Sequence, residues 1–151
     1  PMYMSSKLRH IFILANILWV VIIFILCAMP VMIPDPHWNI PHLDKVVHFG
    51  MYFVLSILLI FPLEEYSCLK LSRIYLIAIL VALIYGGGIE ILQANFFNRS
   101  GDVWDLVADV SGGIAGCLCY PIVKRFIPMK IEFYSKFQFS IFNSQLIKVV
   151  L

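Results

Sequence analysis

Four long apolar stretches constrain the fold of this chain more than any other feature. They run over about residues 11–29, 43–63, 74–96 and 103–127. Each supplies the roughly 20 apolar residues that an α-helix needs to cross a hydrocarbon core about 30 Å thick. With 62% hydrophobic and 13% charged residues among 151, the chain has too few polar residues to cover a water-facing surface. The sequence therefore predicts an all-α integral membrane protein, a bundle of four transmembrane helices.

A cleavable signal peptide is the competing interpretation of the first stretch. Its apolar run is long, however, and the segment 30–34 that follows it (PVMIP) is a poor small-residue cleavage site. We therefore expect a transmembrane domain over residues 2–127, with Pro1 left out as a remnant before it. The tail, residues 128–151, either lies along the inner leaflet as an amphipathic helix or is partly ordered.

Lysine and arginine are distributed unevenly between the two ends of these spans. Nine of the eleven precede the first span, separate the second from the third, or follow the fourth, whereas Lys45 and Arg99 lie at the opposite ends. By the positive-inside rule, both termini should be cytoplasmic and the loops at 30–42 and 98–101 should face outward. The net charge is only +2 and the basic residues line one interface, so we expect membrane lipids, and no nucleic acid, as partners.

Polar and ionisable residues gather at one end of the last three spans. In the second and third spans they are three or four residues apart and therefore share a helix face. In the fourth span, Asp102, Asp105 and Asp109 form an i, i+3, i+7 stripe that descends roughly 10 Å into the membrane. The predicted topology brings all three groups to the outer face. We call this set the polar cluster: Asp44, Lys45, His48, Tyr52, Glu90, Gln93, Arg99, Asp102, Asp105 and Asp109.

Part of the polar cluster has a purely structural interpretation. Asp102 suits the N-cap of the fourth span and Asp105 its N3 position, where carboxylates favour the helix dipole. The three deeper residues, Asp109, Glu90 and His48, are not explained in this way. A lone carboxylate at membrane depth costs about 2.5–3.5 kcal/mol even on the lenient insertion scale. Capping therefore accounts for two residues and not for the cluster.

Small residues flank the polar cluster and predict close helix packing. Three successive glycines, 86–88, precede Glu90, and Ala108, Gly112 and Gly116 form a small-xxx-small row on the fourth span. Because successive glycines weaken a helix, the first group is also compatible with a kink or with backbone that lines a cavity.

Three motifs in the expected order resemble the VanZ-like family of bacterial membrane proteins. They are DKVVHF at 44–49, EILQ at 90–93 and RSGDVWD at 99–105, and Gly112 and Gly116 follow. The family is named for a protein that lowers bacterial susceptibility to the glycopeptide teicoplanin. The resemblance implies a multi-pass protein of the bacterial cytoplasmic (inner) membrane that acts on or near the cell envelope.

The chain departs from the family pattern at one position. The usual asparagine is replaced by Asp109, which adds a negative charge at the deepest point of the cluster. This replacement favours proton or cation chemistry there over simple hydrogen bonding by an amide.

A membrane-embedded enzyme is one function that the polar cluster fits. It would modify a lipid-linked or headgroup substrate at the outer face. His48 would be the general base or acid, because histidine titrates near neutral pH. Glu90, Asp102 and Asp105 would orient it or hold a divalent metal, whose presence and identity the sequence leaves open.

A non-catalytic bundle that binds a lipid headgroup or a lipoglycopeptide is the alternative. In either case Lys45 and Arg99 would hold a phosphate or carboxylate through charge-assisted hydrogen bonds. The other candidates for contact with the substrate are Gln93, Asp44, Asp109 and Tyr52.

Two further interpretations are a structural bundle whose cluster fixes helix register and a small proton-coupled transporter. The structural bundle needs a partner for every carboxylate, but five carboxylates exceed the available cations. Such crowding favours protonation of some of them or recruits a cation. A transporter needs polar residues that continue inward, where the spans are apolar apart from Ser56 and Ser111.

Overall fold

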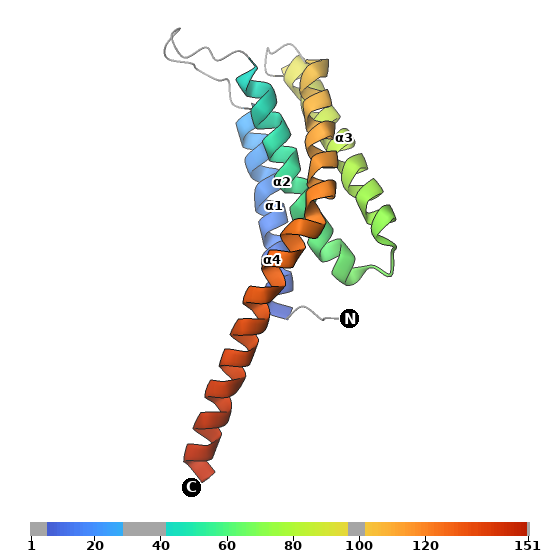
Figure 1. The fold of residues 1–151 in the computed structure, drawn as a ribbon. Helices are drawn as coiled ribbons and strands as arrows, with labels where there is room; N and C mark the ends of the chain where they lie inside the picture. Colours follow the sequence, from blue (N-terminus) through green and yellow to red (C-terminus); the bar gives the residue numbers. More distant parts are fainter. Residues whose placement is uncertain (1–5, 29–41, 97–101, 151) are drawn as a thin grey trace. The chain divides into compact units, whose positions relative to one another are not determined.

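The structure is a computed structural model that describes residues 6–28, 42–96 and 102–150, with side chains described for 10–27, 42–65, 67–96 and 102–126. These residues form four α-helices and no strand (Figure 1). The helices are α1 (Ser6–Ala28), α2 (Leu43–Tyr66), α3 (Leu71–Phe96) and α4 (Val103–Val150). The all-α prediction is therefore confirmed.

Each helix contains a segment that is long and apolar enough to cross a membrane. Within the described residues these segments are His10–Cys27, Leu43–Glu65, Leu71–Phe96 and Val103–Phe126. They agree with the predicted spans within a few residues. α3 begins three residues before the predicted start at 74, because its first turn extends into the polar segment next to the membrane. The side of the membrane on which each terminus lies stays a prediction.

The chain divides into two compact units at Leu118, inside α4 and before the predicted boundary at residue 127. The second unit, Cys119–Leu151, continues α4 as a helix to Val150. In it, the Lys124 ammonium lies 6.0 Å from the centre of the Tyr120 ring. The tail is therefore helical over this range, and its placement along a leaflet stays a prediction.

In the first unit, α1 is tied to α2 and α3 by side chains that donate to backbone carbonyls. Trp19 Nε1 donates to the Met51 carbonyl at 2.9 Å, and the Tyr85 hydroxyl donates to the Val20 carbonyl at 2.7 Å. The membrane-spanning part of α1 contains no charged residue. Since apolar contact alone gives little drive for association in lipid, these hydrogen bonds help to fix its position.

Glycines of α4 allow close approach to α2, as the small-residue row predicts. A Cβ at Gly112 would overlap the Phe49 carbonyl, and a Cβ at Gly116 would lie 2.6 Å from the Phe53 carbonyl oxygen. α3 is a continuous helix through glycines 86–88, and the first of them is packed against α4. The contact between Gly86 and α4 lies on the side of the bundle where the polar cluster is. It brings the ionisable ends of α2, α3 and α4 within reach of one another.

Candidate functional site

The candidate site lies where α2 and α4 begin and α3 ends (Figure 1). Successive spans run in opposite directions, so the first turns of α2 and α4 lie at the same end of the bundle as the last turns of α3. Each helix contributes its polar turn at this end. Direct contacts join six of the ten predicted members of the polar cluster across these helices: Lys45, His48, Glu90, Asp102, Asp105 and Asp109.

The deepest contact in the site is between the imidazole of His48 and the carboxylate of Asp109. Nδ1 of His48 lies 2.9 Å from Oδ1 of Asp109, and the two side chains are 5% and 1% exposed. The contact joins the first turns of α2 to the second turn of α4. A carboxylate in this position holds the imidazole in one orientation and fixes which ring nitrogen carries the proton.

Lys45 lies above this pair and is bound by α4. Its ammonium donates to Oδ2 of Asp102 at 2.7 Å and to Oδ1 of Asp105 at 2.9 Å, and it is 3.8 Å from Oδ2 of Asp44. The side chain of Asp105 is 6% exposed and that of Asp102 is 40% exposed. Lys45 is thus already neutralised by carboxylates, which weakens its predicted role as a clamp for an anionic headgroup.

Asp102 combines its predicted capping role with two contacts across the bundle. Its Oδ1 accepts a hydrogen bond from the Trp104 backbone N–H at 2.9 Å, directly before α4, as an N-cap does. Its own backbone N–H donates to Oε2 of Glu90 on α3 at 2.9 Å. The hydrogen bond from Lys45, together with that from Trp104, lowers the pKa of the Asp102 carboxyl below its ordinary value.

Three side chains of the site lie close enough together to be candidate metal ligands. One nitrogen of His48 and one carboxylate oxygen each of Glu90 and Asp105 all lie within 4.8 Å of one another. The second carboxylate oxygen of Glu90, Oε1, is buried and has no hydrogen-bond partner within the described part of the chain. The imidazole and the two carboxyl groups come from three different helices, point to a common region and are each able to lose a proton.

The other predicted members of the polar cluster are less closely involved. Gln93 is buried and donates from Nε2 to the Cys27 carbonyl of α1 at 2.9 Å. Tyr52 is fully buried, and its hydroxyl has no hydrogen-bond partner among the residues with described side chains. Asp44 is half exposed at the start of α2. Arg99 lies outside the described residues.

The sequence predicts the close helix approach at Gly86 but not its neighbour. Gly86 was expected to allow close helix approach, but its specific neighbour, the Asp109 carboxylate, was not predicted. The signal that points to it is spacing: Gly86 lies four residues before Glu90 and therefore shares its face of α3.

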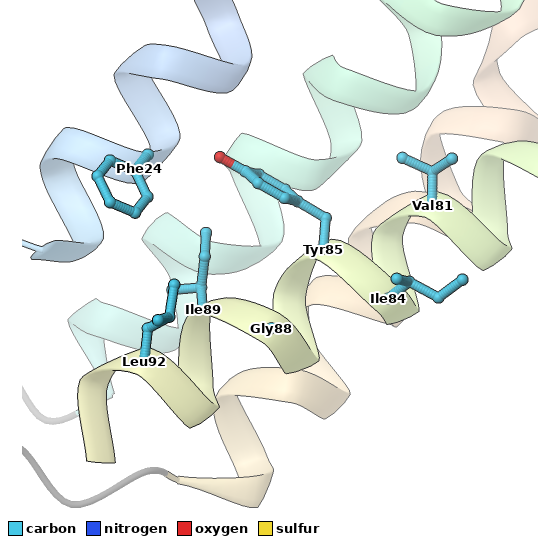
Figure 2. Close-up of a pocket in the computed structure, with 7 residues that line it drawn as sticks. All are labelled: Phe24, Val81, Ile84, Tyr85, Gly88, Ile89 and Leu92. Carbon is cyan, nitrogen blue, oxygen red and sulfur yellow. The ribbon is translucent and has the colours of Figure 1, made fainter. Parts of the chain in front are cut away.

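A separate apolar groove of about 420 Å³ runs along α1 and α3 (Figure 2). Its lining includes Phe24, Tyr85, Gly88 and Leu92. The lining of the groove contains no acid, lysine, arginine, histidine or cysteine, and its one hydroxyl, that of Tyr85, donates to the Val20 carbonyl. The polar cluster is therefore the stronger candidate for a functional site.

Comparison with known proteins agrees with the motifs of the polar cluster. No curated protein and no solved structure matches the chain. A family model described as VanZ/LLP1 matches residues 3–124. This range includes every residue of the cluster, the first three membrane-spanning segments and all but the last two residues of the fourth. This multi-pass membrane protein therefore belongs to the VanZ/LLP1 family.

Proposed function

We propose that this protein is an enzyme of the bacterial cytoplasmic membrane that alters the polar headgroup of a lipid-linked envelope substrate at the outer face. The observation that carries the proposal is the buried contact between His48 and Asp109, with Glu90 and Asp105 beside it. Strongly interacting ionisable groups that converge in a membrane protein usually serve a function, because their burial is costly.

His48 is the central residue of the proposed site. With its Nδ1 proton directed to Asp109, the neutral imidazole keeps a lone pair on Nε2. That lone pair is able to take up a proton or bind a metal ion, which are the two ways in which histidine contributes to catalysis. Asp109 acts through His48 and is a positioning residue.

The location of the site favours a lipid-linked substrate. Asp102 and Lys45 are partly exposed at the end of the bundle, whereas His48 and Asp109 are buried about one to two turns deeper. A molecule with acyl chains in the bilayer presents its headgroup at this level. The distribution of lysine and arginine supports the outer face for this end of the bundle.

The contacts of Lys45 favour an enzyme over a headgroup-binding bundle. A binder of anionic headgroups needs free cations, but Lys45 is paired with Asp102 and Asp105. Among its described residues, the site has more carboxylates than cations, and this composition suits proton or cation chemistry better than capture of a phosphate.

The proposal is tested by mass spectrometry of envelope lipids and cell-wall precursors. Cells would express wild type, His48→Ala or the control His42→Asn at matched membrane levels. His42 is exposed with a left-handed backbone (φ 65°) that asparagine also adopts. We expect one molecular species to accumulate or disappear with wild type and His42→Asn only.

Teicoplanin susceptibility is measured on the same strains. A susceptibility difference that depends on His48, with identical lipid and precursor profiles, would contradict the enzyme and favour the binding bundle. No effect of His48→Ala on either measurement would contradict both.

A further inference from the structure

We propose that His48, Glu90 and Asp105 bind one divalent transition-metal ion, for which zinc is the first probe. The inference deepens the proposed function and rests on it for the use of the ion in catalysis. The binding site itself is argued from the geometry of the three side chains.

The separation of the three groups suits a single ion. Zinc binds histidine nitrogen and carboxylate oxygen at about 2.0–2.2 Å, so any two ligand atoms on one ion lie within about 4.4 Å. In the structure the three candidate atoms lie within 4.8 Å of one another. Small side-chain rotations are therefore sufficient to close the site around an ion.

Each candidate ligand is held by a neighbour through one atom and keeps another atom for the metal. Asp109 holds Nδ1 of His48, the Asp102 backbone N–H holds Oε2 of Glu90, and Lys45 holds Oδ1 of Asp105. Such outer contacts orient metal ligands in known sites, and the histidine–carboxylate contact is the commonest of them. We assign as ligands the atoms outside these contacts, which are Nε2 of His48, Oε1 of Glu90 and Oδ2 of Asp105.

Glu90 provides a second and independent observation. Its Oε1 is buried and lacks any hydrogen-bond partner in the described chain, and a buried oxygen of this kind is costly to leave unsatisfied. A metal ion bound by Oε1 would satisfy it. Within the described part of the chain, the carboxylate of Asp105 is paired with Lys45, whereas those of Glu90 and Asp109 have no lysine or arginine partner. A divalent cation would balance this negative charge.

The donor set selects the class of ion. One imidazole nitrogen with two carboxylate oxygens suits zinc or manganese, whereas magnesium and calcium prefer oxygen alone. Three protein ligands leave a fourth position open, as in catalytic zinc sites. A bound ion would there polarise a substrate oxygen or activate a water molecule.

The test measures metal binding directly, without relying on activity. Full-length protein without a polyhistidine tag is purified in detergent, stripped of metal and titrated with Zn²⁺, and bound metal is counted by mass spectrometry. We expect one equivalent for wild type and for the control His42→Asn, which removes an exposed imidazole outside the polar cluster. His48→Ala and Glu90→Gln should each weaken binding at least 10-fold.

Cobalt substitution keeps the test decisive if a variant fails to fold. Wild-type protein loaded with Co²⁺ should show the visible absorption of a four- or five-coordinate nitrogen–oxygen site, and no thiolate band from the four cysteines. The inference would be overturned if folded wild type bound neither ion. It would also be overturned if His48→Ala and Glu90→Gln bound the ions as tightly as wild type does.

The two proposals fail in different ways. If the lipid profile depends on His48 but no metal binds, the proposed enzyme stands without the ion. If the ion binds at the three ligands but no lipid or precursor changes, the metal site stands and the proposed enzyme does not.

Discussion

Gly86 of α3 lies directly against the carboxylate of Asp109 on α4. A Cβ atom at position 86 would be 2.5 Å from Oδ2 of Asp109 and 3.2 Å from its Cβ. Because the other oxygen of this carboxylate contacts His48 at 2.9 Å, the absence of a side chain at position 86 allows the buried pair to form.

We therefore expect Gly86→Ala to displace Asp109 from His48. Loss of a contact that orients a metal ligand typically costs about 10–100-fold in metal affinity or activity, and we predict an effect of that size on zinc affinity. Gly88→Ala is the matched control, since nothing lies within 4 Å of a Cβ there. Equal zinc affinity of the two variants would show that Gly86 does not position Asp109.

The contact between α2 and α4 predicts a different effect for Gly112→Ala. The new methyl group would overlap the Phe49 carbonyl, and backbone, unlike a flexible side chain, does not move aside without separating the helices. We expect the free energy of unfolding to fall by about 1–3 kcal/mol, measured by unfolding in mixed detergent micelles. Gly50→Ala, with open space around its Cβ, should stay within about 0.5 kcal/mol of wild type. The opposite order would contradict the packing.

The helices, and the gathering of six members of the polar cluster at one end of them, were predictable from the sequence because both follow from spacing. Long apolar runs fix where helices cross the membrane, and i+3 and i+4 spacing fixes which residues share a face. The pairing of bases with acids was not predictable. The contact of His48 with Asp109 and the contact of Lys45 with α4 depend on how each helix is rotated about its axis and shifted along it. Apolar periodicity does not determine these two quantities.

Gln93 illustrates a second limit of the sequence. Its spacing from Glu90 predicts a shared helix face, but it does not indicate that the amide donates to the Cys27 carbonyl of α1. A backbone carbonyl leaves no mark in the amino-acid sequence, so no pattern indicates such a partner.

Burial predicts that the two ion pairs of Lys45 differ in strength. Solvent screens an ion pair more strongly when its members are exposed, and Asp102 is 40% exposed. Asp105 is only 6% exposed, so that its attraction to the Lys45 ammonium is screened less. Double-mutant cycles that combine Lys45→Met with Asp102→Asn or Asp105→Asn should therefore give the larger coupling for Asp105. Asparagine is also a good N-cap residue, so Asp102→Asn does not add a loss of helix capping to the loss of the ion pair. Equal couplings would contradict this ranking.

The hydrogen bond of Gln93 predicts a modest structural effect. Hydrogen bonds between transmembrane helices contribute about 0.6 kcal/mol on average, and at most about 1.7 kcal/mol. We expect Gln93→Leu to lower the free energy of unfolding by an amount in this range, because it frees the Cys27 carbonyl. Asn95→Leu is the control, since exposed Asn95 donates within α3 to Ile91. If both variants unfold at the same denaturant concentration, the stability of the contact between α1 and α3 does not depend on Gln93, and the hydrogen bonds of Trp19 and Tyr85 hold α1 in place without it.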